Sequence, residues 1–345
     1  FAVPDGALEQ ADNVVVIKEG VLSKIKGSYL YFDPSTKVPV SLFEYRGVLF
    51  CVFEDKFSKF ADTGTAPNET GSETTLSGET IACVSPRISR KMEAKDNLYF
   101  TTDRGVMKIE SVTGKIHKAG IPPALDLGGK FIAANGGIDG NNQVGWRVVF
   151  GRRDSNNNLL LGAPGDILVL TNPNNTGLAW TRGGGGPYTI TVTTTAAHNL
   201  AVGQTVTIAN GPASMNGDQV VASTPTATSF TFSMVADPGA NGTLDYVTTR
   251  TARLEFSLPQ EISDVADGYF FRIYRTSLSG AATALPLGDF KLIDEQAISS
   301  AQITARVISY DDDVPDLFRD AELYTNNSSR EGEAQANNRP PLASD

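Results

Sequence analysis

The chain has 345 residues, of which 40% are hydrophobic and 20% are charged, and its formal net charge is -10. This length and apolar content are enough to bury a sizeable core in two or three domains. The acidic balance disfavours a protein that grips nucleic-acid phosphates through clustered Lys and Arg. The longest apolar runs, such as Gly47 to Phe53, are far shorter than the roughly 20 residues of a membrane span.

Short β-branched or alternating apolar runs recur along the chain, cut by Gly, Asn, Asp and Pro, while helical spacing is nearly absent. This pattern predicts an all-β protein. Turns that contain Gly47 and Gly105 are spaced for hairpins, and we take both glycines as structural turn positions. The predicted strands are Asn13–Ile17, Ser28–Phe32, Pro39–Tyr45, Val48–Glu54, Asn97–Thr101, Gly105–Glu110, Val144–Arg152, Ile167–Thr171, Tyr188–Thr194, Thr205–Ile208, Ser229–Met234, Ala252–Ser257, Phe270–Arg275, Phe290–Asp294 and Arg306–Tyr310.

The first predicted domain covers residues 1–126. Strand starts of the form Gly-Val-apolar recur at Gly20, Gly47 and Gly105, which is typical of a radial β-meander such as the blades of a propeller. Within this domain, Asp62 to Gly78 is polar and without periodicity, so we expect a long exposed loop there. Because the chain opens Phe-Ala-Val-Pro-Asp, with neither Met nor a signal-peptide pattern, we expect its original first residues to be missing.

Residues 133–171 and 251–313 carry the strand patterns of an antiparallel β-sandwich of the fibronectin or immunoglobulin kind. Between them, 172–249 is rich in Thr, Gly and Asn and nearly free of charge. This change in composition predicts a small β-domain inserted into a loop of the sandwich. Residues 314–345 are polar and are predicted to form an extended exit segment. Because the sequence ends Pro-Pro-Leu-Ala-Ser-Asp, we expect the natural polypeptide to continue.

Candidate catalytic and metal-binding groups are few. Cys51 and Cys83 stand singly in apolar contexts, which predicts buried thiols rather than a metal site. The chain has two histidines, and we interpret His198 as filling a hydrogen-bonded turn. No nucleophile elbow, zinc-binding helix motif or phosphate loop occurs in the sequence. We therefore predict a protein that is not an enzyme, with no catalytic, cofactor-binding or metal-binding residues.

Pairs of acidic residues are the remaining candidates for a catalytic or metal-binding site. The run Asp311 to Asp313, or Asp264 with Asp267, could supply paired carboxylates for cleaving a polysaccharide. The run Asp311 to Asp313 could also supply oxygen ligands for Ca²⁺. Successive residues of a strand face opposite sides, however, and the spacing matches no known calcium loop. We interpret these residues as solvated turns.

Three segments of the first predicted domain carry a resemblance: Gly6 to Gly27, Asn97 to Ile109 and Ala119 to Ala124. In turn they resemble the start, a blade hairpin and the following linker of bacteriophage tail nozzle (tail tubular) proteins of the podovirus type. Segments similar to their sandwich and exit strand are Arg272-Ile-Tyr-Arg-Thr-Ser, Ser309-Tyr-Asp-Asp-Asp-Val-Pro-Asp, Glu322-Leu-Tyr-Thr-Asn-Asn-Ser and Ala336-Asn-Asn-Arg-Pro-Pro-Leu-Ala-Ser-Asp.

The predicted insert carries a second resemblance. Its Ala197-His-Asn-Leu and Val202-Gly-Gln-Thr-Val runs, followed by Met215-Asn-Gly-Asp-Gln-Val-Val and Thr228-Ser-Phe-Thr-Phe, are similar to a small β-module of phage tail and receptor-binding proteins. Neither resemblance brings a catalytic residue with it.

Together these resemblances imply a structural virion protein located in the tail. The implied assembly is a homohexameric ring below the portal and its adaptor, part of the tail tube, which retains genomic DNA and conducts it during ejection without binding it specifically. A wall of negative charge would repel the phosphates of the passing duplex, and ring closure would require heterologous interfaces. We expect Arg272, Tyr274 and Arg275 to form a packing or interface cluster on the sandwich.

The alternative is a receptor-binding or adhesin-like tail protein. In that case the aromatic residues Trp180, Tyr188 and Tyr246 of the insert would contact host surface glycans, although their places at strand starts favour the core. A peripheral trimer would fit this alternative, whereas an axial six-fold ring would fit the nozzle. A polysaccharide-degrading enzyme is a third and more distant possibility.

Overall fold

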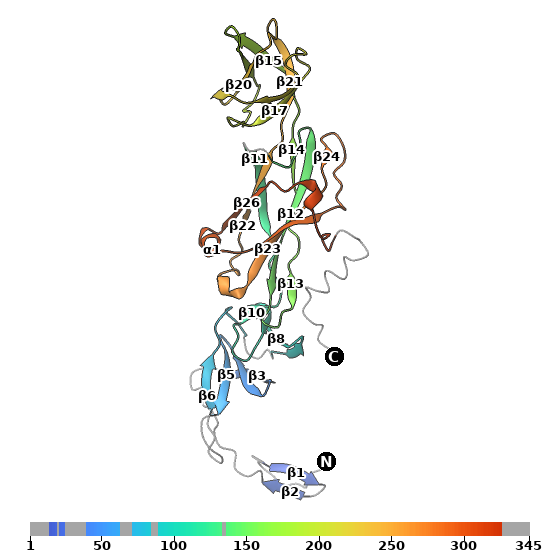
Figure 1. Cartoon of the computed structure of the whole chain (residues 1–345). Helices are drawn as coiled ribbons and strands as arrows, with labels where there is room; N and C mark the ends of the chain where they lie inside the picture. The colour runs from blue at the N-terminus through green and yellow to red at the C-terminus, as the bar shows by residue number, and fades with distance from the viewer. Residues whose placement is uncertain are drawn as a thin grey trace. The chain divides into compact units, whose positions relative to one another are not determined.

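The computed structural model describes residues 14–18, 21–24, 39–62, 71–83, 89–132 and 136–325, and Figure 1 traces their strands. Within these ranges the chain is built from antiparallel sheets, with one short α-helix, α1 (Ser300–Ala305), and two 3-10 turns, η1 (Val265–Asp267) and η2 (Asp316–Phe318). The all-β prediction is confirmed. No described helix has the length and apolarity to cross a membrane.

The chain divides into two compact units, with the boundary between Ala119 and Gly120. In the described part of the first unit, two four-stranded sheets each follow chain order, as a meander does, and a separate strand pair precedes them. The pair is β1 (Val14–Lys18) and β2 (Val21–Lys24); the first meander is β3 (Pro39–Tyr45), β4 (Val48–Phe53), β5 (Phe57–Asp62) and β6 (Gly71–Thr75); the second is β7 (Lys91–Ala94), β8 (Asn97–Thr102), β9 (Gly105–Ile109) and β10 (His117–Lys118).

A tight turn joins β3 to β4. Tyr45 pairs with Val48, so Arg46 and Gly47 make up the whole loop. Their φ angles are 51° and 75°, as a type I′ turn requires, and glycine adopts this conformation without a steric penalty. Gly105 lies at the start of β9 with φ 103°, after the equally short turn that joins β8 to β9.

Aromatic side chains join the two meanders. Phe57 stacks on Phe50 with ring centroids 5.3 Å apart and on Phe100 with centroids 4.4 Å apart. Phe57 and Phe50 come from the first meander and Phe100 from the second, so the two sheets share one core. Cys51 and Cys83 are buried thiols, as predicted.

Two sheets of the second unit face each other across a common core that draws on β12, β22, β23 and β26. They form a β-sandwich because each strand alternates apolar side chains toward this core. The first sheet has the order β11 (Leu125–Ile132), β22 (Thr251–Ser257), β26 (Val307–Asp312); the second has the order β13 (Leu159–Leu161), β12 (Asn142–Arg153), β23 (Tyr269–Arg275), β25 (Lys291–Ala297), with β14 (Leu168–Asn172) and β24 (Ser279–Gly280) also paired to β12.

Seven strands between β14 and β22 form a sheet with a hydrophobic core of its own, which includes Trp180, Phe230 and Phe232. All of them lie within the range 172–249. In sheet order they are β18 (Gly217–Val220), β17 (Thr205–Ala209), β21 (Gly242–Val247), β15 (Asn175–Gly183), β16 (Tyr188–Thr193), β20 (Ser229–Met234) and β19 (Ser223–Thr226). We refer to the part of the chain from β15 to β21, residues 175–247, as the insert.

The predicted loop from Asp62 to Gly78 is wrong in part, because β6 occupies Gly71–Thr75 and pairs with β5. This strand lies at the edge of its sheet and carries polar side chains, so it has no apolar alternation for a sequence pattern to detect. Polar contacts hold it in place: Ser58 donates a hydrogen bond of 2.7 Å to Glu73, and Lys56 forms an ion pair with Glu73.

The described part of the exit segment, residues 314–325, returns to the second sheet. Residues 320–323 pair along β25, with backbone hydrogen bonds of 2.8 Å from Leu292 to Ala321, from Asp320 to Leu292 and from Leu323 to Phe290. Leu323 is buried against Val149, Tyr274 and Phe290. The segment therefore covers the outer edge of the second sheet. Residues 326–345 and the predicted strand Ser28–Phe32 lie outside the described residues.

Candidate functional site

A cluster of buried charges lies at one end of the sandwich core. On β23, Phe271, Ile273 and Arg275 alternate toward the interior, so the guanidinium follows two apolar side chains into the core. On β26 the same alternation turns Asp312 inward after Tyr310. Arg275 and Asp312 both have exposed fractions of 0%. Each sheet thus contributes one charge to a water-excluded pair.

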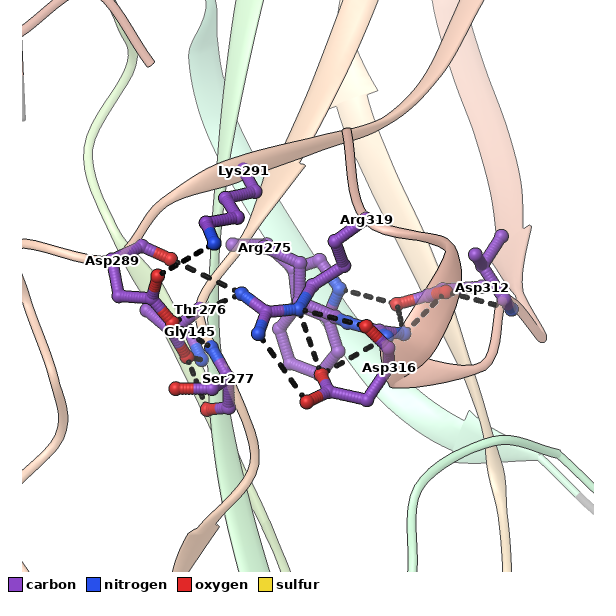
Figure 2. A network of polar contacts seen from close by, with 11 residues as sticks. Gly145, Arg275, Thr276, Ser277, Asp289, Lys291, Asp312, Asp316 and Arg319 are labelled. Atoms are coloured by element: carbon purple, nitrogen blue, oxygen red, sulfur yellow. Dashed lines mark hydrogen bonds and ion pairs between the residues drawn. The ribbon is translucent and has the colours of Figure 1, made fainter. Parts of the chain in front are cut away.

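Asp312 is fully surrounded by donors (Figure 2). Nη1 of Arg275 lies 2.9 Å from both carboxylate oxygens. Nε1 of Trp146 donates to Oδ2 at 2.7 Å, and the backbone N–H of Val314 donates to Oδ1 at 3.1 Å. Unpaired charges are costly to bury, and these partners offset the loss of hydration. The carboxylate therefore fastens β26 to β12, to β23 and to the start of the exit segment.

A second layer of charge reaches outward from this pair. Nη2 of Arg275 lies 3.5 Å from Oδ1 of Asp316, and Nε of Arg319 lies 2.9 Å from the same oxygen. Nη1 of Arg319 also contacts Oδ2 of Asp289 at 3.0 Å. Charges alternate in sign along this chain of contacts (Figure 2), which fixes η2 and the loop before β25 against the sandwich.

Asp289 anchors the outer end of the network. Burial by itself would raise the pKa of this carboxyl, but hydrogen bonds from Ser277 and Arg319, with the charge of Arg319, lower the pKa below its ordinary value. The backbone N–H of Ser277 lies 3.2 Å from Oδ2. Next to it, Thr276 exchanges hydrogen bonds with Gly145 of β12, because the Gly145 N–H donates to Oγ1 at 3.1 Å and the Thr276 N–H donates to the Gly145 carbonyl at 3.0 Å. The strand end is thus held on both sides.

We define the charge network as Arg275, Asp289, Asp312, Asp316 and Arg319. Its guanidinium and carboxylate groups are already paired with each other, and Trp146 adds a further donor. This arrangement suits mechanical stabilisation of the sheets. Within the described ranges, no group of His, Cys, Asp and Glu side chains is suited to hold a metal ion.

The predicted cluster of Arg272, Tyr274 and Arg275 is divided between the two faces of β23. Nε of Arg272 donates to Glu295 at 2.6 Å, and its Nη1 lies 3.5 Å from the Tyr274 hydroxyl. Tyr274 packs with Val149 outside the sandwich core, whereas Arg275 points into that core. The division follows from strand geometry, because adjacent residues face opposite sides. Gly47 and Gly105 belong to the first unit, whereas Arg272, Tyr274 and Arg275 belong to the second.

The interpretation of Asp311 to Asp313 as a solvated turn is wrong. Asp311 and Asp312 belong to β26, and the first forms an exposed bidentate pair with Arg253 at 2.7 Å while the second is buried. The sequence interpretation overlooked the alternation of Ile308, Tyr310 and Asp312, which indicates that the Asp312 side chain faces the core. Asp264 instead accepts a hydrogen bond from Ala266 and caps η1.

His198 fills a turn, as predicted. The Leu200 N–H donates to Nδ1 at 2.9 Å, so Nε2 carries the proton and lies 3.1 Å from the carbonyl oxygens of Thr226 and Ser229. Both ring nitrogens are therefore used by the fold. Of the three aromatic residues considered for glycan contact, Trp180 and Tyr246 are 2% and 1% exposed and belong to the core of the insert, which leaves Tyr188 as the partly accessible one.

The members of the charge network other than Arg275 were not predicted. Asp289 and Arg319 lie in loops and Asp316 begins the short turn η2, all without periodicity in the sequence. Their pairing depends on how the exit segment returns to β25. Trp146 lies in a strand that was predicted, at Val144–Arg152, and its apolar neighbours mark it as a core residue. The hydrogen bond to a distant carboxylate has no signal in the local sequence.

No known protein family and no curated protein matches the chain. Among solved structures it is similar to one described as "Phage phi92 endosialidase", with 13% sequence identity and a TM-score of 0.18. The match covers 74% of this chain but 39% of that protein, so the chain corresponds to well under half of its length. A TM-score this low does not indicate a shared fold.

Proposed function

We propose that this chain is a structural protein of a bacteriophage tail, a subunit of a homohexameric nozzle ring that retains genomic DNA and conducts it during ejection. The observation that carries the proposal is that three segments similar to nozzle proteins lie on or along strands of the same sandwich. The segment from Arg272 lies about 30 residues before the two neighbouring segments from Ser309 and Glu322. The three run through β23, through β26 and along β25. The first two supply Arg275, Asp312 and Asp316 to the charge network.

The type of stabilisation supports the same proposal. A tail component must keep its shape while it confines pressurised DNA, and a buried ion pair whose carboxylate accepts several hydrogen bonds favours one arrangement of the strands over its competitors. The network links both sheets of the sandwich to the exit segment. We propose a mechanical role for it and no catalytic one.

Charge provides the second support. Residues 250–325 contain many more carboxylates than basic groups, including the exposed Asp313, Asp320 and Glu322. An acidic surface repels phosphate, which suits a conduit that lets DNA pass without holding it. We propose the portal, its adaptor and further copies of the chain as partners, joined by heterologous interfaces that close a ring.

A receptor-binding role is the second candidate, and Tyr188 is the observation that favours it. This partly exposed ring carries Arg182 over its face at 5.3 Å, and Arg182 forms an ion pair with Asp237. Aromatic, cationic and acidic groups together can recognise a glycan. The candidate would place the chain at the periphery of the tail.

Electron microscopy of the full-length chain and of tails that contain it separates the two candidates. An axial six-fold ring is the result expected for the nozzle, and a peripheral trimer or a monomer would overturn it. Glycan binding is measured in parallel with Tyr188→Ala, with Tyr99→Ala as the control for a half-buried tyrosine outside the insert. Binding that is lost in the first variant and kept in the second would support the receptor-binding role.

A further inference from the structure

The chain passes between the sandwich and the insert twice, once after β14 and once before β22. The two passages are residues 172–174 and residues 248–250. Both pair with the same loop of the sandwich, residues 136–141, which comes directly before β12. The Asn141 N–H donates to the Asn172 carbonyl at 2.8 Å on the outward passage. On the return passage, Ile138 and Arg250 exchange backbone hydrogen bonds of 3.0 and 3.2 Å. The two passages are therefore anchored side by side.

The side chain of Asn172 ties the two passages together. It is 0% exposed. Its Nδ2 donates to the carbonyl of Ile138 at 3.0 Å and to the carbonyl of Thr248 at 2.7 Å. One buried amide thus joins the outward passage, the return passage and the sandwich loop, and buried amides of this kind keep their partners because water is not available to replace them.

The insert holds the return passage from its own side. Nε2 of Gln204 lies 3.2 Å from both Thr248 Oγ1 and the Thr249 carbonyl, and Thr248 Oγ1 donates to the Thr205 carbonyl at 2.8 Å. Nη2 of Arg250 donates to the His198 carbonyl at 3.0 Å. Loops of the insert therefore contact the residues that the sandwich loop also contacts.

Close backbone packing leaves these passages little freedom to bend. A Cβ atom on Gly140 would lie 2.5 Å from the Cβ of Val247, and one on Gly136 would lie 2.3 Å from the Arg250 carbonyl oxygen. Contacts below 3 Å are forbidden to ordinary side chains, so only glycine permits this approach. The sandwich loop therefore packs directly on the return passage.

From these contacts we infer that the passage between sandwich and insert is a rigid joint, and that the insert is carried in a fixed orientation on the sandwich. A flexible tether would leave Asn172, Gln204 and Arg250 to exchange partners with water, whereas all three are buried here. The joint transmits force and orientation from anything that contacts the insert to the sandwich. The inference holds for either candidate function, since it depends on neither.

Pulsed electron paramagnetic resonance on the full chain tests the joint. Spin labels are attached through Val235→Cys on the insert and Val265→Cys on the sandwich, both of which replace exposed residues, while Cys51 and Cys83 are buried. We expect a single narrow distance distribution. Asn172→Ala and Arg250→Ala in this labelled chain should broaden it, because each removes hydrogen bonds that span the joint.

Asn210→Ala is the matched control, since it removes a 2.6 Å hydrogen bond to Asp245 on the insert surface and should leave the width unchanged. If the Asn172 or Arg250 variants do not fold, Gln204→Ala is the milder variant, because it removes only the hydrogen bonds from Gln204 to Thr248 and Thr249. A broad distribution before any joint residue is changed, or an unchanged width in the folded joint variants, would overturn the inference.

Discussion

Asp311 and Asp312 are neighbours on β26, and the side chain of Asp311 is exposed whereas that of Asp312 is buried. The carboxylate of Asp311 pairs with Arg253 on the exposed face, with both oxygens 2.7 Å from the guanidinium. The carboxylate of Asp312 pairs with Arg275 inside the sandwich, where neither side chain is exposed. One strand thus offers a buried ion pair and an exposed ion pair one residue apart.

This contrast predicts unequal losses of stability. Arg275→Met should lower the free energy of unfolding by about 3–5 kcal/mol, because it leaves Asp312 buried without its cation. Arg253→Met should cause a far smaller loss, since water can solvate Asp311 in its place. Urea unfolding of both variants checks the difference. The double variant Arg275→Met with Asp312→Leu should recover only part of the loss, because it removes the buried charge but also the acceptor of Trp146 and Val314. Equal losses for the two single variants would contradict the assigned role of the network.

Acid should weaken the second unit through Asp289. Its pKa is lowered in the folded chain, with hydrogen bonds from Ser277 and Arg319 outweighing the effect of burial. The native state therefore binds fewer protons than the unfolded state, and the stability from this group is present above the ordinary value of 3.8 and lost as pH falls through the lower folded value. Melting temperatures measured from neutral pH to about pH 3 should fall less steeply for Asp289→Asn than for the parent chain.

Thiol reactivity should report the burial of the first unit. Burial raises the pKa of Cys51 to about 11, and the nearby charge of Glu73 adds to this effect. Because the thiolate is the reactive form, Cys51 should not react with Ellman's reagent at neutral pH until the chain unfolds. Cys83 is 3% exposed, so the folded chain should shield it from the reagent. Ser72→Cys places a thiol at an exposed position and should react at once. Rapid reaction of the native parent chain would show that this core opens readily.

The hairpin glycine Gly47 should resist substitution for a backbone reason. A Cβ atom there meets nothing within 4 Å, yet φ is +75°. Gly47→Ala should therefore cost about 1 kcal/mol through the left-handed conformation alone. Gly120→Ala is the matched control, because it also meets nothing within 4 Å and has no positive φ. Thermal unfolding of both variants checks this, and equal melting temperatures would contradict the conformational explanation.

Alternation made much of the fold predictable. Pro39–Tyr45 and Ser229–Met234 were predicted with the bounds that β3 and β20 have, because apolar side chains on one face leave a period of two in the sequence. The polar strands β6 and β18 and the glycine-rich β11 carry no such period. These strands form because they pair with a neighbouring strand, and a local sequence pattern does not show that pairing.

The charge network was harder to predict for a related reason. Arg275 was singled out from its own segment, but its partners Asp312 and Asp316 come from another strand and from the exit segment. The alternation of Ile308, Tyr310 and Asp312 indicates which face of the strand carries the carboxylate, but it does not indicate which cation lies opposite. The register between strands decides that pairing, and register is a property of the assembled sheet.

The pairing of residues 320–323 along β25 has a consequence for colloidal behaviour. An uncovered strand edge is a template on which other chains can add strands, and aggregation starts at such edges. Here the chain closes its own edge with Asp320 and Ala321 and seats Leu323 over an apolar surface. The last described residues therefore cover the β25 edge, which lowers the tendency of concentrated copies of the chain to aggregate through that edge.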